Sequence, residues 1–287
     1  MAKLTLRQIV LAALNQSLGA TYERTPIMAD HADLHRVPSG ITELDAMTGG
    51  GFYGFTIVAG PPKQGKSLIA QQSAVQGALA GWQTFYAYGE MTHGQVIQRT
   101  CNALGRSREN WPDRMANFEP FRFRRGADVE VMLRHFADQI PVYSERVLIV
   151  LDSLNRLAAH MAREQNHTHA YFRAIDRISS ICQDITEFSD GRICVVALSE
   201  QNQQGGAKGG QVEYDAQCIV KLKPAKGPHC VSIHIDSRDS PGGDLGEFQR
   251  VYESCRFVRA CDAYDERASE PPEFPGEPRL SGELPWD

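Results

Sequence analysis

The sequence predicts an α/β fold, with a mainly parallel sheet flanked by helices and antiparallel strands added at one edge. Between residues 55 and 200, short apolar runs alternate with segments in which apolar residues recur every three or four positions. That alternation is typical of parallel strands joined by helices that cover both faces of a sheet. After residue 210 strand-like runs follow one another directly, which predicts antiparallel strands. With 287 residues and 42% apolar content, the chain can bury one substantial core.

The first strand is expected at FTIVA (residues 55–59), and the helix after it carries Leu68, Val75 and Leu79 at helical spacing before Gly81 ends it. Further strands are expected at residues 83–90, 121–125, 146–152 and 192–199. The helices between them are expected at residues 92–104, 128–140 and 170–188. The later strand-like runs lie at residues 217–223, 229–236 and 247–254.

Composition divides the chain into three regions. Residues 1–36 hold a predicted helix at 4–18, with one apolar face, and a polar linker. Residues 37–260 form the predicted core domain, and residues 261–287 form an acidic, proline-rich tail with the composition of a disordered segment. The net charge is −5, but residues 262–287 hold eight acidic and two basic residues, so the remaining chain carries about +1. A body this close to neutral neither supports nor excludes nucleic acid binding.

The cysteines and the hydropathy pattern indicate the cellular compartment in which we expect the protein. The seven cysteines include no C-x-x-C pair, and no window of 18 apolar residues or signal-peptide pattern is present. We therefore expect reduced, buried thiols in a cytoplasmic protein that has no membrane partner. Three histidines (160, 167 and 169) fall in a polar segment without a nearby cysteine or a helical histidine pair, which disfavours a metal site there.

The stretch GPPKQGKS at residues 60–67, here called the glycine-rich loop, fits the pattern G-x-x-x-x-G-K-[ST]. Gly60 and Gly65 allow successive backbone N–H groups to point inward and form an anion nest. Lys66 is predicted to reach the β- and γ-phosphates of a nucleotide, and the Ser67 hydroxyl to ligate Mg²⁺. Because a strand precedes the loop and a helix follows it, the pattern predicts nucleotide binding by these residues: Gly60, Pro61, Pro62, Lys63, Gln64, Gly65, Lys66, Ser67 and Leu68.

Two carboxylates are expected at the same edge of the sheet. Hydrolysis of a nucleotide needs a carboxylate that holds Mg²⁺ and a group that activates the attacking water. Asp152 ends the run VLIVLD, and ligands of open α/β sheets bind at the carboxyl ends of the strands. Asp152 is therefore predicted to hold Mg²⁺ together with Ser67. Glu90 ends the strand at residues 83–90, which follows the phosphate-binding helix, and is the candidate general base.

Four segments resemble the RecA-like ATPases, and they are closest to the core of DnaB-type helicases. YGEMTHGQVIQR (88–99) is similar to the DnaB-type pattern E-M-[ST]-x-x-Q-hydrophobic-x-x-R, and GGQVEYDAQ (209–217) is similar to G-x-[IV]-E-x-D-A-D. SGITELDAMTGGG (39–51) resembles the opening segment of RecA, RadA, KaiC and DnaB proteins. HIDSRDSPGG (234–243) resembles their K-x-R-x-G-P-x-G segment. The matches run from about residue 37 to 250.

The resemblance implies a RecA-like fold that hydrolyses ATP with Mg²⁺ between neighbouring subunits of a homo-oligomer, a ring such as a hexamer or a filament. It implies catalytic roles for Lys66 and Glu90, and for Arg238 as an arginine finger acting on the neighbouring subunit. The family's lysine two residues before this arginine is Asp236 here, so Lys221 or Lys223 is a candidate for the missing charge. The γ-phosphate sensor of the family, a glutamine directly after a serine, corresponds to Glu200 or, with a shift of one residue, to Gln201.

By resemblance, two loops contact DNA, at residues 160–169 with Arg163 and at residues 203–208 with Lys208. The alternative is that both are simply mobile loops. The helix at 4–18 either docks on a neighbouring subunit or caps its own core. The acidic tail either is plainly disordered or docks on a protein partner or on the basic loops.

The leading hypothesis is an ATP-hydrolysing oligomeric motor on single-stranded DNA, a helicase, a translocase or a DNA-remodelling enzyme. One alternative is a KaiC-like signalling ATPase that acts on protein partners. The other is a RecA-type recombinase or mediator that forms filaments on DNA.

Overall fold

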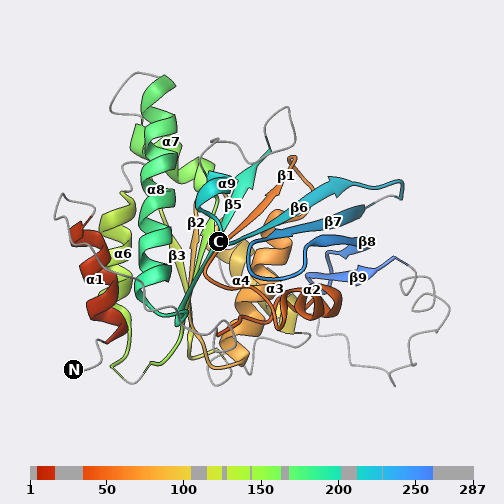
Figure 1. Cartoon of the computed structure of the whole chain (residues 1–287). Coiled ribbons are helices and arrows are strands. Elements are labelled where there is room, and N and C mark those ends of the chain that lie inside the picture. Colours follow the sequence, from red (N-terminus) through yellow and green to blue (C-terminus); the bar gives the residue numbers. More distant parts are fainter. Residues whose placement is uncertain are drawn as a thin grey trace, which may run out of the picture.

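The computed structural model describes residues 5–16, 35–104, 115–124, 128–142, 144–162, 168–201, 212–227 and 229–260. Within these residues the chain forms one nine-stranded sheet in the order β3-β2-β4-β5-β1-β6-β7-β8-β9 (Figure 1). All but the last two residues of the predicted linker and all of the acidic tail lie outside the described residues, so the domain boundaries drawn from composition stay predictions. No helix in the described part of the chain is long and apolar enough to cross a membrane.

The parallel part of the sheet holds six strands: β1 (Phe55–Gly60), β2 (Gln83–Tyr88), β3 (Phe118–Arg122), β4 (Val147–Asp152), β5 (Ile193–Glu200) and β6 (Cys218–Pro224). The antiparallel part adds β7 (Cys230–Ser237), β8 (Gly243–Val251) and β9 (Arg256–Arg259) beyond β6. This arrangement confirms the predicted fold class. The carboxyl ends of β1, β2, β4 and β5 meet at one edge of the sheet, as parallel pairing requires.

Helices cover both faces of the parallel strands. One face carries α1 (Leu6–Gln16), α6 (Val129–Gln139), α7 (Leu154–Ala162) and α8 (Thr168–Phe188), and the other carries α2 (Thr42–Thr48), α3 (Lys66–Leu79) and α4 (His93–Leu104) (Figure 1). A short helix, α9 (Val212–Asp215), precedes β6. Successive residues of a strand serve opposite faces: Ile57 packs with the first group of helices and Val58 with the second.

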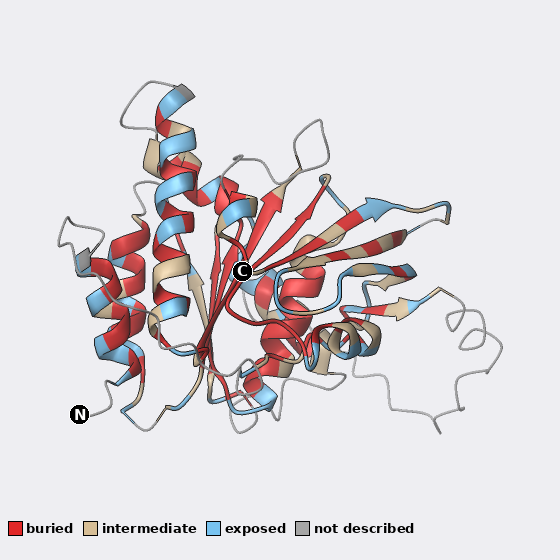
Figure 2. Ribbon diagram, in the orientation of Figure 1, coloured by how far each residue is buried: buried red, intermediate tan, exposed pale blue. Residues whose placement is uncertain are grey.

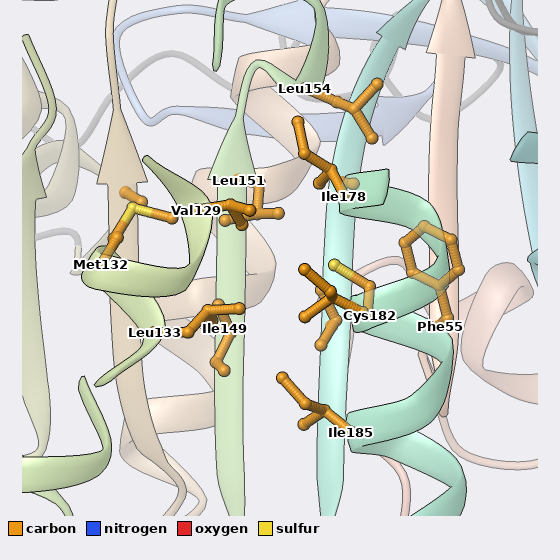
Figure 3. Packing of buried hydrophobic residues seen from close by; sticks show 14 of the residues in the cluster. Phe55, Val129, Met132, Leu133, Ile149, Leu151, Leu154, Ile178, Cys182 and Ile185 are labelled. Carbon is orange, nitrogen blue, oxygen red and sulfur yellow. The ribbon is translucent and has the colours of Figure 1, made fainter. Parts of the chain in front are cut away.

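The core therefore consists of two apolar layers separated by the sheet. The central strands are buried on both faces, and the exposed residues of the helices point outward (Figure 2). In the first layer, Ile178, Cys182 and Ile185 of α8 pack against strand residues such as Phe55 and Ile149 (Figure 3). These are the inward positions that the helical periodicity predicts. Burial of both strand faces also explains why the strands appear in the sequence as continuous apolar runs.

The helix α1 packs on its own chain. Its buried side chains belong to the same apolar cluster as those of α6 and α8. Arg7 of α1 also forms an ion pair with Asp138 of α6 at 2.6 Å, between two exposed side chains. Of the two placements that the sequence left open, the structure has the helix as a cap on its own core.

The structure differs from the expected elements in three places. The strand expected at residues 121–125 is β3, which begins earlier, at Phe118, and ends at Arg122. Residues 154–162 form the helix α7 where a loop was expected, because Leu154, Leu157 and Ala158 recur at helical spacing and are buried. The strand expected at residues 247–254 is instead β8, which ends at Val251, and a turn at residues 252–255 leads into the unpredicted β9. That turn carries Tyr252 to the glycine-rich loop.

Candidate nucleotide-binding site

The glycine-rich loop connects β1 to α3, and close packing explains its glycines. A Cβ added at Gly60 would lie 3.0 Å from the backbone oxygen of Leu222 on β6. Gly65 has a φ of +93°, and a Cβ there would lie 2.8 Å from Cζ of Phe257. Lys63 also has a positive φ, of 64°. The loop is therefore left-handed at Lys63 and Gly65, which suits an anion nest, and it lies tightly against β6 and β9.

Lys66 begins α3, and its ammonium folds over the loop. Its Nζ donates hydrogen bonds to the carbonyl oxygens of Gly60 (2.7 Å) and Pro61 (2.9 Å). Burial lowers the pKa of this lysine, and the carboxylates of Glu200, Asp152 and Glu90 oppose that shift in this order. The predicted phosphate-binding cation thus lies near the predicted general base Glu90, the predicted Mg²⁺ ligand Asp152 and Glu200.

Asp152 is the buried end of β4, and its side chain is held by two hydroxyl groups. Oδ1 accepts a hydrogen bond from Oγ of Ser67 (3.1 Å), and Oδ2 accepts one from the hydroxyl of Tyr86 (2.7 Å). Burial raises the pKa of this carboxyl, and the hydrogen bonds from Tyr86 and Ser67 oppose the rise. The structure therefore brings together Ser67 and Asp152, the two residues predicted to ligate Mg²⁺.

These two residues fit Mg²⁺. Magnesium prefers oxygen ligands and is commonly held by one or two protein oxygens together with water and substrate phosphates. A hydroxyl and a carboxylate 3.1 Å apart, next to an anion nest, supply such a set. In the described part of the chain no group of three or more His, Cys, Asp or Glu residues is arranged to hold a metal by itself. His160 is buried and packs edge-on against Phe123, as a core residue does.

A pocket of about 450 Å³ lies in front of the glycine-rich loop. It brings together most of the predicted site and several residues from elsewhere in the chain. Glu90 is exposed and lies two residues beyond the end of β2. The lining residues are Pro62, Lys63, Gly65, Lys66, Ser67, Leu68, Glu90, Arg99, Asp152, Ser153, Glu200 and Tyr252. A larger open hollow of about 790 Å³ lies between α2 and the β8–β9 edge, away from the glycine-rich loop.

Arg99 is a pocket residue to which sequence reasoning attached no role. It lies on α4, and its Nη1 contacts the thioether sulfur of Met91 at 3.1 Å. Its positive charge lowers the pKa of Asp152 and so opposes the rise that burial causes, as the hydrogen bonds from Tyr86 and Ser67 also do. The signal was present in the sequence, because Arg99 is the last residue of the DnaB-like pattern, eight positions after Met91.

At the end of β5 the pocket is lined by Glu200. The Glu200 N–H donates to Oδ1 of Asn155 (2.7 Å), and Nδ2 of Asn155 donates to the hydroxyl of Tyr171 (2.8 Å). Gln201 follows it and is not among the lining residues, and its Nε2 is buried without a hydrogen-bond partner in the described part of the chain. The assignment of Gln201 as a γ-phosphate sensor stays a prediction.

Arg238 lies far from its own glycine-rich loop. It follows β7, is exposed, and its N–H donates to the carbonyl of Gln217, just before β6. Cys218 aligns with Thr56, four residues before Gly60 on β1, which is about 13 Å along the strand. Arg238 is therefore absent from the pocket of its own chain.

Asp236, in the position of the family's lysine, is bound by two side chains of its own sheet. Lys221 forms an ion pair with it at 2.6 Å, and Nε2 of His234 lies 2.9 Å away. Burial raises the pKa of Asp236, but the hydrogen bonds from Lys221 and His234 outweigh it and hold the pKa below its usual value. Lys221 is thus already ion-paired with Asp236 of the same chain, whereas the side chain of Lys223 is exposed to solvent.

The predicted DNA-contacting residues Arg163 and Lys208 lie outside the described residues. The loop expected at residues 160–169 is helical at both ends, because α7 runs to Ala162 and α8 begins at Thr168. The segment with Lys208 follows β5, which contributes Glu200 to the pocket.

Comparisons with known proteins agree with this geometry. A family model described as "ATPase: KaiC" matches residues 37–232. A DNA repair protein RadA of Brucella abortus (strain 2308) is 33% identical over 243 residues, 83% of this chain and 48% of that protein. A RadA of Mycobacterium tuberculosis (strain CDC 1551 / Oshkosh) is 29% identical over 161 residues, 52% of this chain and 31% of that protein. The chain thus spans about half or less of the length of these relatives.

Solved structures share the fold. The ATPase domain of G40P has a TM-score of 0.60 at 20% identity, over 90% of this chain and 99% of that domain. A DnaB-like replicative helicase has a TM-score of 0.60 at 20% identity, over 88% of this chain and 75% of that one. The RadB recombinase has a TM-score of 0.55 at 19% identity, over 76% and 97%. Because the family model covers most of the sheet together with the glycine-rich loop, Glu90 and Asp152, the chain belongs to the KaiC family of ATPases, within the RecA-like P-loop ATPase superfamily.

Proposed function

We propose that this protein hydrolyses ATP between neighbouring copies of itself, in a ring such as a hexamer, and uses the hydrolysis to move along or remodel single-stranded DNA. The observation that carries the proposal is that the predicted catalytic residues lie at two separate places on the chain. Lys66, Ser67, Asp152 and Glu90 meet at one pocket, while Arg238 projects from the opposite end of β6. A second copy is needed to bring such an arginine to the pocket.

Each pocket residue has a role that follows from its position. The N–H groups of the glycine-rich loop and the Lys66 ammonium bind and orient the phosphates. Ser67 and Asp152 hold Mg²⁺, which when bound neutralises charge on the β- and γ-phosphates. Glu90 is exposed at the mouth of the pocket, where it can accept the proton of the attacking water. Arg238 of a neighbouring copy stabilises the charge that develops on the γ-phosphate.

DNA as the partner is supported by the relatives. The curated relatives are DNA repair proteins, and the structural neighbours include a replicative helicase and a recombinase. The loops that carry Arg163 and Lys208 supply cations for phosphate contacts. The second candidate, a signalling ATPase that acts on proteins, is favoured by the KaiC family model and by the near-neutral charge of residues 1–261.

The thiols support the cytoplasmic assignment. Cys101, Cys182, Cys194, Cys218 and Cys255 are buried and free. Burial raises the pKa of Cys218 to about 12 and that of Cys255 to about 11, so both stay unreactive thiols at neutral pH. A reducing compartment suits such cysteines.

The deciding experiment measures ATP turnover of the full chain with and without single-stranded DNA at increasing salt. We expect stimulation by DNA that fades as salt rises, because phosphate contacts release counterions. Lys66→Ala is the control that removes turnover under every condition. Turnover that is independent of DNA at low salt would refute the DNA motor and favour the signalling ATPase.

A further inference from the structure

Two buried tyrosines of β2, Tyr86 and Tyr88, lie on the same face of the sheet beside β4. In the register of the two strands Tyr88 lies opposite Asp152. Tyr86, two residues earlier, lies diagonally to Asp152, which is within reach of a long aromatic side chain. Its hydroxyl donates to Oδ2 of Asp152 at 2.7 Å. The hydroxyl of Tyr88 is instead hydrogen-bonded to Nδ1 of His93 on α4, at 2.9 Å.

The hydroxyl of Tyr86 is a hydrogen-bond donor in a fixed place. The side chain is fully buried, and its ring packs against those of Tyr88 and Phe118, with centroids 6.3 and 6.2 Å away. A phenylalanine would fill the same apolar space, and a buried hydroxyl costs free energy unless it is hydrogen-bonded. Burial and the nearby charge of Asp152 raise the pKa of Tyr86 well above its usual value. Because the hydroxyl keeps its proton at neutral pH, it donates to Asp152 and does not carry a proton.

The two oxygens of the Asp152 carboxylate have different partners. Oδ2 accepts from Tyr86, and Oδ1 accepts from Ser67, the other predicted Mg²⁺ ligand. The carboxylate cannot rotate without losing the bond at Oδ2, so that bond keeps Oδ1 beside the Ser67 hydroxyl. Partners that orient metal-binding carboxylates in this way commonly set the metal affinity, and losing one typically costs about 10–100-fold.

We propose that Tyr86 is a positioning residue that orients Asp152 for Mg²⁺ and so sets the affinity of the site for the metal. The inference rests on the proposed binding of ATP with Mg²⁺ at the glycine-rich loop. Tyr86 is not among the residues that line the pocket, so it acts through Asp152. Loss of its hydroxyl should therefore weaken the contribution of Mg²⁺ to nucleotide binding. The contacts of the phosphates with the glycine-rich loop should stay as they are.

The test separates the metal from the nucleotide on the full chain. Calorimetry measures ADP binding in EDTA and in excess Mg²⁺, and the ratio of the two dissociation constants gives the contribution of the metal. Tyr86→Phe is expected to bind ADP in EDTA as the wild type does, and to lose about tenfold of the affinity that Mg²⁺ adds. In an Asp152→Asn background, Tyr86→Phe should cause no further loss. Tyr88→Phe is the matched control, because it removes a buried hydroxyl from the same face of the same strand and should leave the ratio unchanged.

Each other outcome has a defined meaning. A wild-type ratio in Tyr86→Phe would overturn the positioning role. Equal losses in EDTA and in Mg²⁺ would also overturn it, because the hydroxyl would then support the glycine-rich loop and not the metal ligand. The same loss of ratio in Tyr88→Phe would show that the effect is not specific to the bond with Asp152. If the wild type bound no ADP in either condition, the proposed nucleotide site itself would fail, which is distinct from a failure of Tyr86 alone.

Discussion

Mixing two inactive variants tests whether Arg238 acts on a neighbouring copy. Glu90→Gln removes the base from the pocket of its own chain, and Arg238→Ala removes the arginine at the opposite end of β6, about 13 Å along the strand from the glycine-rich loop. Each variant alone should lose most of its turnover, by about 10³-fold or more for the arginine. In a ring of head-to-tail contacts, a site is intact when a chain with Glu90 faces a chain with Arg238.

The size of the rescue follows from random assembly. In a one-to-one mixture of Glu90→Gln and Arg238→Ala chains, about a quarter of the contacts combine an intact pocket with an intact arginine when the ring closes head to tail. Turnover should therefore return to about a quarter of the wild-type rate in that symmetric arrangement. The assay is ATP turnover of the two variants expressed together, against each variant alone.

A second mixture is the control. Glu90→Gln and Lys66→Ala both damage the same pocket of the same chain, where the two residues line one cavity. No mixture of these two restores a complete pocket, so no rescue is expected. Rescue in this control, or no rescue in the Glu90→Gln and Arg238→Ala mixture, would refute the trans assignment of Arg238.

Two further predictions concern stability. Asp152→Asn should abolish turnover yet raise the melting temperature at pH 7, without nucleotide or Mg²⁺, by about 2–4 °C for each kcal/mol gained. Burial raises the pKa of Asp152, so the folded state favours the neutral carboxyl, and the stability that this neutral form contributes is lost as pH rises through the folded-state pKa. The higher melting temperature of Asp152→Asn should therefore disappear below about pH 3.9, where the wild-type carboxyl is also neutral. A melting temperature of Asp152→Asn below that of the wild type at pH 7 would contradict the prediction. Leu14→Ala in the buried face of α1 should cost about 2–5 kcal/mol in urea unfolding, whereas Ala12→Ser on its exposed face should change stability by no more than about 0.5 kcal/mol. Equal effects of the two would show that α1 does not pack on its own core in solution.

The strands were predictable because the sheet is buried on both faces. Runs such as the one that ends at Asp152 are continuous in apolar residues, and that pattern survives without knowledge of the neighbours. The order of the strands was not predictable, because periodicity carries no information about which strand lies next to which. The strand β9, with the sequence RFVR, was missed because it is short, lies at the edge and alternates only weakly.

Some residues of the candidate site were also predictable from the sequence, and others were not. The sequence predicted the roles of the glycine-rich loop and of Asp152 because each role can be recognised from a few adjacent residues. Arg99 and Tyr252 reach the pocket from α4 and from the turn after β8, and their roles depend on how distant segments pack. Tyr252 in particular lies in a run that the sequence predicted as strand, whereas the structure ends that strand at Val251.

The charges that line the pocket give a physical reason to expect a second copy at the site. Three carboxylates, those of Glu90, Asp152 and Glu200, offset the three cations Lys63, Lys66 and Arg99, so the lining is formally neutral. A triphosphate with one Mg²⁺ keeps a charge of about −2, and negative charge must be stabilised further as the γ-phosphate is transferred. Glu200 opposes that stabilisation, and Lys221 is paired with Asp236 within the sheet. Arg238, exposed at the opposite end of β6, is a cation that a neighbour can present, and the mixing experiment asks whether it does so.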